Sequence, residues 1–152
     1  MPLVSLRFRF TQRFRRPARE VYAWATDYSP DDPAAMGLPG SRRVERLGAD
    51  AVLLTDRFGA PGKRVAKKKL VRLYPERLSW TNTHLSGPNR HSQFLYELVP
   101  DGPRACHLVF TGSQVSHPPK ALSPKQARAL AQEVRDQDAA LWKRLAAALH
   151  RS

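Results

Sequence analysis

The alternation of hydrophobic and polar residues predicts one strand, two short helices, six further strands and a long closing helix. Residues 3–10 alternate strictly, which is typical of a half-buried strand. Pro17 suits the first turn of a short helix that ends near Asp27. Asp32 is placed to cap a second brief helix that begins at Pro33. Because a sheet that meets one helix only at its end must curl around it, the order of elements itself favours an internal cavity.

The six further strand-like runs are divided by turn residues at the spacing of an antiparallel meander. The runs cover residues 42–47, 51–58, 64–74, 77–85, 92–99 and 106–115. Alternation predicts an inner face made of Val52, Leu54, Phe58, Leu78, Trp80, Phe94, Tyr96, Leu98, Cys106, Leu108 and Phe110. The run 64–74 has lysines on both faces, so we expect a bulge or a strongly twisted strand there.

The closing helix is capped by Ser123 and contains neither glycine nor a further proline over residues 125–149. Its apolar stripe carries small side chains in the first half and bulky ones from Leu141 onward. We therefore expect any hollow to lie against residues 127–134. The alternative is that the sheet closes down on the alanines, because empty interior volume is costly.

Composition indicates one globular domain over residues 1–152, since 41% of the residues are hydrophobic and 26% are charged. A single cysteine, Cys106, excludes an intrachain disulfide. The chain starts with an alternating strand rather than a signal peptide, and no apolar run is long enough to span a membrane, so we expect a cytoplasmic protein.

The formal charge of +13 constrains partners more than it constrains the fold. The basic residues are spread over every element rather than gathered on one. We expect at most a weak contact with an anionic surface, through the outward Arg7 and Arg9 and the lysines of residues 67–69. No specific nucleic-acid site is expected, because exposed aromatics do not alternate with the basic residues.

Three stretches carry a family resemblance: FRRPAREVY at residues 14–22 followed by Asp27, FLYELVPDG at 94–102, and the helix 123–149. Together with the order of elements they resemble the START-type and polyketide cyclase superfamily, SRPBCC, which includes the birch pollen allergens. The family's turn commonly continues with Gly-Thr, whereas Pro103, Arg104 and Ala105 follow here. The resemblance implies an α+β helix-grip fold, in which a curved seven-stranded antiparallel sheet wraps a C-terminal helix. It also implies an apolar ligand such as a lipid, sterol or polyketide; some members are cyclases or hydrolases.

The candidate ligand-binding residues face the predicted interior. They are Trp80, Asn82, His84, Phe94, Tyr96, Phe110, Leu130, Val134 and Asp138. Asp138 falls on the apolar stripe, either as a polar anchor or general base or, by the reading we favour, paired with a strand lysine or arginine at the stripe edge. His84 near a strand end is expected to be solvated or structurally hydrogen-bonded rather than catalytic.

Three functions follow. The first is binding or carriage of an apolar small molecule between sheet and helix. The second is a cyclase or dehydratase that uses Asp138, His84 or Tyr96 for proton transfer, and the third is a basic surface module. We expect no cofactor and no metal, because the five histidines lack metal-ligand spacing.

Overall fold

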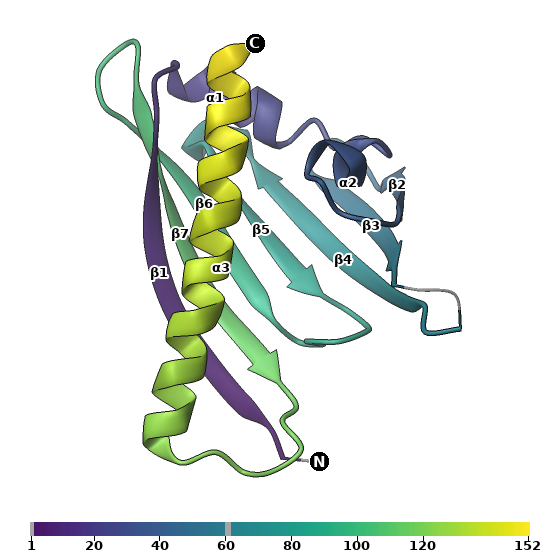
Figure 1. The fold of residues 1–152 in the computed structure, drawn as a ribbon. Helices are drawn as coiled ribbons and strands as arrows, with labels where there is room; N and C mark the ends of the chain where they lie inside the picture. Colours follow the sequence, from purple (N-terminus) through teal and green to yellow (C-terminus); the bar gives the residue numbers. More distant parts are fainter. Residues whose placement is uncertain (1, 60–61) are drawn as a thin grey trace.

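The computed structural model describes residues 2–59 and 62–152. Within them one antiparallel sheet with strand order β1-β7-β6-β5-β4-β3-β2 curls around helix α3 (Figure 1). The strands are β1 (Val4–Phe14), β2 (Ser41–Arg46), β3 (Ala51–Phe58), β4 (Val65–Tyr74), β5 (Ser79–His84), β6 (Gln93–Pro100) and β7 (Cys106–Ser116). The helices are α1 (Ala18–Ala25), α2 (Asp32–Ala35), the single turn η1 (Pro75–Arg77) and α3 (Pro124–Arg151). The predicted order and the helix-grip architecture are confirmed.

The start of α3 is capped as the sequence predicts, and its end is held by hydrogen bonds that the sequence did not indicate. Ser123 Oγ accepts a hydrogen bond from the Gln126 amide at 3.1 Å, and Gln126 Oε1 accepts one from the Ser123 amide at 2.9 Å, which completes a capping box. At the other end, Arg16 donates to the carbonyls of Leu149 and Ser152. The last turn of the helix is thereby held against the segment that joins β1 to α1.

One of the two alternatives predicted for β4 is wrong, and so is the predicted cap of α2. Pairing of β3 with β4 is continuous from Ala51 and Arg72 to Phe58 and Val65, so β4 has no bulge in that stretch, although it is partly exposed as the other alternative held. The lysines occupy both faces because the strand is regular, with Lys67 and Lys69 inward and Lys68 outward. Asp32 does not cap α2: its carboxylate accepts instead from the Ser29 amide and from Arg42.

The position of the hollow also differs from the prediction. The cavity is lined by α3 residues from Val134 to Ala148, so it lies against the bulky half of the helix. Helix α3 packs mainly along β1, and the sheet diverges from it toward β4 and β3 (Figure 1). Trp142 packs edge-on against Phe14 and Trp24, with ring centroids 6.4 and 6.5 Å away. The strand under the helix, rather than the size of the helix side chains, decides where volume remains.

The core near β1 depends on one close approach. Phe8 and Phe10 stack on Phe110, with ring centroids 5.9 and 4.6 Å apart. The tip of the Phe8 ring lies over Gly112 of β7, where an added Cβ would come within 2.6 Å of Cζ. Glycine at this position makes room for the ring, and a larger residue would have to displace it.

Helices in the described part of the chain include none that is long and apolar enough to cross a membrane.

Candidate functional site

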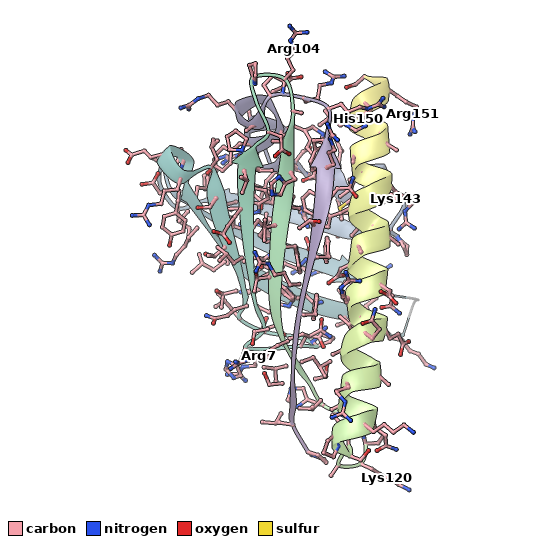
Figure 2. All side chains as sticks on the ribbon, turned by 90° about the vertical axis from the view of Figure 1, so that its left-hand side faces the viewer. Arg7, Arg104, Lys120, Lys143, His150 and Arg151 are labelled. Carbon is pink, nitrogen blue, oxygen red and sulfur yellow. The ribbon has the colours of Figure 1, made fainter. Side chains whose placement is uncertain are left out.

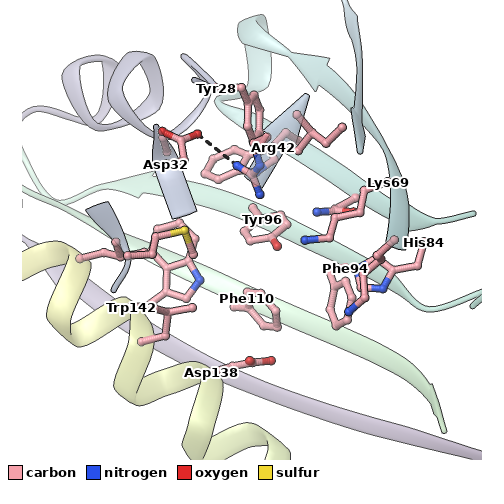
Figure 3. Close-up of a pocket in the computed structure, with 18 of the residues that line it drawn as sticks. Tyr28, Asp32, Arg42, Lys69, His84, Phe94, Tyr96, Phe110, Asp138 and Trp142 are labelled. Carbon is pink, nitrogen blue, oxygen red and sulfur yellow. Dashed lines mark hydrogen bonds and ion pairs between the residues drawn. The ribbon is translucent and has the colours of Figure 1, made fainter. Parts of the chain in front are cut away.

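A cavity of about 550 Å³, partly open to solvent, lies between α3, the concave face of the sheet and the α1–α2 segment (Figure 3). Its volume falls in the range of small-molecule sites. The strands β3 to β7 contribute alternate residues to it, because side chains of one parity all point to the concave face.

One side of the cavity is an aromatic wall, made of Trp80, Phe94, Tyr96, Phe110 and Trp142. Trp80 and Tyr96 stack in parallel with centroids 4.7 Å apart, and Phe110 meets Tyr96 edge-on at 5.0 Å. The ring centroid of Trp142 on α3 lies 5.8 Å from that of Tyr96, so the aromatic wall continues from the sheet onto the helix. Burial raises the pKa of the Tyr96 hydroxyl, which keeps it neutral. Tyr96 and Trp142 are only partly buried and leave ring surface for a ligand, whereas Trp80, Phe94 and Phe110 are almost fully buried around them.

The opposite side holds a buried ion-pair network. Asp56 Oδ1 accepts a hydrogen bond from Arg42 Nε at 2.8 Å. Asp56 Oδ2 accepts one from Arg42 Nη2 at 3.0 Å, and Lys69 Nζ lies 2.8 Å from the same oxygen. Arg42 Nη1 donates to Asp32 at 3.1 Å. Burial acts to raise the pKa of Asp56, but the hydrogen bonds and charges of Arg42 and Lys69 outweigh it and hold the pKa low.

Lys67 stands apart from that network although it shares the inward face of β4 with Lys69. Within the described residues it makes no ion pair, and its ammonium lies 5.5 Å above the Phe58 ring. Burial lowers the pKa of Lys67, and the neighbouring charge of Lys69 lowers it further. Lys67 is a half-buried cation that faces the cavity, and the charges of Asp56 and Asp138 act on it without an ion pair in the described residues.

His84 is 7% exposed and points into the cavity from the end of β5, so the expectation that it is solvated is wrong. Its Nδ1 is buried with no hydrogen-bond partner among the described residues. Burial, followed by the charges of Lys67 and Lys69, lowers the pKa of His84 to about 3. The ring is therefore neutral at physiological pH and keeps an unused polar nitrogen. Asn82 Oδ1 is unpaired in the same way.

Asp138 faces the cavity from α3 (Figure 3). Burial raises the pKa of this carboxyl to about 6, opposed by the charge of Lys67. It makes no ion pair within residues 2–59 and 62–152, so the pairing with a strand lysine or arginine that we favoured is not observed. The carboxyl changes protonation state within one unit of neutral pH.

The structure brings most of the predicted site residues to this one cavity. Trp80, Asn82, His84, Phe94, Tyr96, Phe110, Val134 and Asp138 line it. Leu130 does not, because it lies one turn before Val134, where α3 follows β1. The residues that sequence reasoning missed include Arg42, Lys67, Lys69 and Trp142. The available signal for the lysines was their inward parity opposite Asp56 in a regular β3–β4 pair.

Charge on the outer surface is dispersed. Labelled basic residues extend from Arg104 at one end of the molecule to Lys120 at the other (Figure 2). Arg7 and Arg9 point outward as predicted. Lys67 and Lys69, however, belong to the cavity, so the lysine cluster expected to act at a surface does not form one. Within the described part of the chain, no group of three or more His, Cys, Asp or Glu is placed to hold a metal ion.

No protein-family model and no curated protein sequence matches the chain. Solved structures are similar to it over almost its whole length. The Zhui aromatase/cyclase from Streptomyces sp. R1128 is 16% identical and superposes with a TM-score of 0.71, with 94% of this chain and 92% of that one covered. A START superfamily protein from Mycobacterium smegmatis is 14% identical with a TM-score of 0.71, covering 95% and 99% of the two chains.

A third similar structure is norcoclaurine synthase from Thalictrum flavum, solved in complex with dopamine and hydroxybenzaldehyde. It is 14% identical with a TM-score of 0.63, and the match covers 97% of this chain and 87% of that one. At these identities the likeness establishes the fold.

Proposed function

The chain has the helix-grip fold of the START and polyketide cyclase (SRPBCC) superfamily, and we propose that it binds an apolar, ring-containing small molecule in the cavity between sheet and helix. The observation that carries the proposal is the aromatic wall along a cavity of about 550 Å³. The similar structures include one solved with two aromatic ligands, which supports the same class of ligand.

Desolvation supplies the binding energy. Burial of apolar ligand surface contributes about 25 cal/mol per Å², so a ligand that buries about 200 Å² gains about 5 kcal/mol before the entropic costs of association. The few polar groups that face the same space, such as Asn82 and His84, would fix the orientation of the ligand.

The test is titration with a neutral aromatic probe, N-phenyl-1-naphthylamine, followed by its own fluorescence and by quenching of the three tryptophans, all of which line the cavity. Native mass spectrometry of freshly purified protein, with solvent extraction, checks for a retained molecule. Leu141→Trp fills the cavity and should weaken probe binding at least about tenfold, whereas Ala140→Trp on the exposed face of α3 should leave it unchanged. Equal binding by both variants would place the ligand elsewhere.

A second candidate function, proton transfer on a bound ligand, is favoured by Asp138. Its pKa of about 6 suits a general acid or base, and Tyr96 and His84 line the same cavity. A ketone probe, 2-tetralone, tests it: the protein should accelerate exchange of its α-protons for deuterium, and Asp138→Asn should abolish the acceleration while binding persists. Exchange no faster than in buffer alone would exclude this function.

A further inference from the structure

Three groups gather at one end of the cavity, and we name Lys67, Lys69 and His84 the basic corner. Lys67 and Lys69 are two residues apart on the same face of β4, about 6.6 Å along the strand. Lys69 is directly opposite His84 in the β4–β5 register. Figure 3 shows Lys69 and His84 side by side at the edge of the aromatic residues Phe94 and Phe110.

The donors of the basic corner are only partly used. Arg42 directs its guanidinium to Asp56 and Asp32, so it has little left to offer a ligand. Lys69 spends one of its three N–H donors on Asp56, and Lys67 spends none on a carboxylate within the described residues. Both lysines can therefore donate to a group placed between them.

Positive charges are close together at the same place. Arg42 and Lys69 form ion pairs with Asp56, and Arg42 also pairs with Asp32 of α2. Lys67 feels the negative charges of Asp56 and Asp138 but forms an ion pair with neither in the described residues. The low pKa of His84 and the lowered pKa of Lys67 each include repulsion from a neighbouring ammonium. An anion at the basic corner would relieve this repulsion and replace the hydration that the lysines have lost.

We infer that the ligand is an apolar aromatic acid, whose ionised carboxylate binds between Lys67 and Lys69 while its rings lie on the aromatic wall. This inference rests on the proposed function and names the ligand class of the same cavity. Phe94 links the two parts, since its ring lies 5.1 Å from His84 and 5.6 Å from Phe110. The neutral His84 ring lines the same end of the cavity, directly opposite Lys69.

Asp138 is the acidic group that faces the basic corner from the helix. Its charge opposes a second carboxylate when ionised, and its protonated form can donate a hydrogen bond to one. A carboxylate ligand should therefore bind together with a proton on Asp138. In this complex the ligand carboxylate would lie between the lysine ammonium groups of β4 and the protonated carboxyl of Asp138 on α3.

The experiment compares two probes of the same shape, 2-naphthoate and its neutral analogue 2-naphthamide, by calorimetric or fluorescence titration at one ionic strength. The wild-type protein should bind the acid about tenfold more tightly than the amide, as one charge-assisted hydrogen bond predicts. Lys67→Met should remove this preference by weakening the acid alone. Lys68→Met, one residue away on the outer face, should retain it.

Lys67→Arg keeps the positive charge and should keep a preference for the acid. Equal affinity of the wild type for both probes would overturn the inference and leave the proposed function standing. Binding of neither probe would overturn both. Equal loss of acid binding in the Lys67→Met and Lys68→Met variants would reveal a general surface-charge effect and would also overturn the inference. The wild-type comparison decides the matter even where a variant fails to fold.

Discussion

The two sides of the cavity are made from the same strand alternation but differ in what their inward residues do. The aromatic wall consists of rings that contact one another as well as the cavity, such as Trp80 on Tyr96 at 4.7 Å. The basic corner and the network behind it place cations where the alternation would accept apolar residues. Rings gain stability from that position, whereas a desolvated cation without a counter-ion does not.

The difference suggests a division of roles. Arg42, Asp56 and Lys69 satisfy one another, so their presence has a structural explanation in the folded chain. Lys67 and Asp138 both face the cavity and act on each other through charge, but they form no ion pair in the described residues. Under the proposed function, Lys67 and Asp138 have the binding role and the paired network has a supporting one.

The largest expected effect tests the aromatic wall. Trp80→Ala removes a ring that is 2% exposed and touches Tyr96, Tyr22 and Trp142, and should lower the free energy of unfolding by about 4 kcal/mol. Urea unfolding followed by far-UV circular dichroism measures it. Trp80→Phe keeps an aromatic ring and should cost less than half as much. A loss below about 1 kcal/mol for Trp80→Ala would show that the wall is not part of the core.

Asp56→Asn tests the supporting network on the other side. The substitution leaves Arg42 and Lys69 buried without their carboxylate and should lower the free energy of unfolding by about 3 kcal/mol. Asp31→Asn replaces an exposed carboxylate nearby and should change stability by less than about 0.5 kcal/mol. Equal, small effects in the two variants would mean that the network is solvated in solution.

The acid sensitivity of the basic corner gives a third prediction. The pKa of His84 is about 3 in the folded protein against 6.5 ordinarily, so folding favours the neutral ring. Its contribution to stability is complete above pH 6.5 and is lost as the pH falls toward 3, with about 2 kcal/mol gone at pH 5. His84→Gln should therefore lose less stability than the wild type between pH 7 and 5, whereas exposed His117→Gln should follow the wild type. Parallel pH profiles for all three proteins would contradict the buried, neutral ring.

Asp138 should give the smallest effect and the opposite slope. Its pKa is raised to about 6, so folding favours the protonated form, and stability from this group is present at low pH and lost as the pH rises through 6. Asp138→Asn should be more stable than the wild type at pH 8 by roughly 1–2 kcal/mol, and equal to it near pH 4. Thermal unfolding at the two pH values measures the difference. A variant that is less stable at pH 8 would mean that the ionised carboxylate has a partner.

Sequence patterns were sufficient for the parts of the molecule that follow local rules. Alternation predicted the inward residues of β5 to β7, and most of the candidate site followed because one parity of those strands faces the cavity. The cap at Ser123 was equally local. The inward lysines of β4 were not predicted as site residues, because a polar side chain is ordinarily expected to be exposed. Only the pairing of β4 with β3, which places Asp56 opposite Lys67, shows that the strand alternates regularly.

The place of the hollow could not be predicted for a different reason. Side-chain size along α3 was the available signal, but the deciding contact is between α3 and β1, which are more than a hundred residues apart. Long-range packing of one helix on one edge strand leaves no trace in the residues of the helix alone.

Because the Phe8 ring lies against Gly112, substitutions at these two positions should be coupled in evolution. A side chain at 112 displaces the ring, whereas a smaller residue at 8 would make room for one. Descendants of this chain should therefore alter both positions together or neither, and aligned relatives that retain a phenylalanine at 8 beside any residue other than glycine at 112 would have to bend the sheet differently at that crossing.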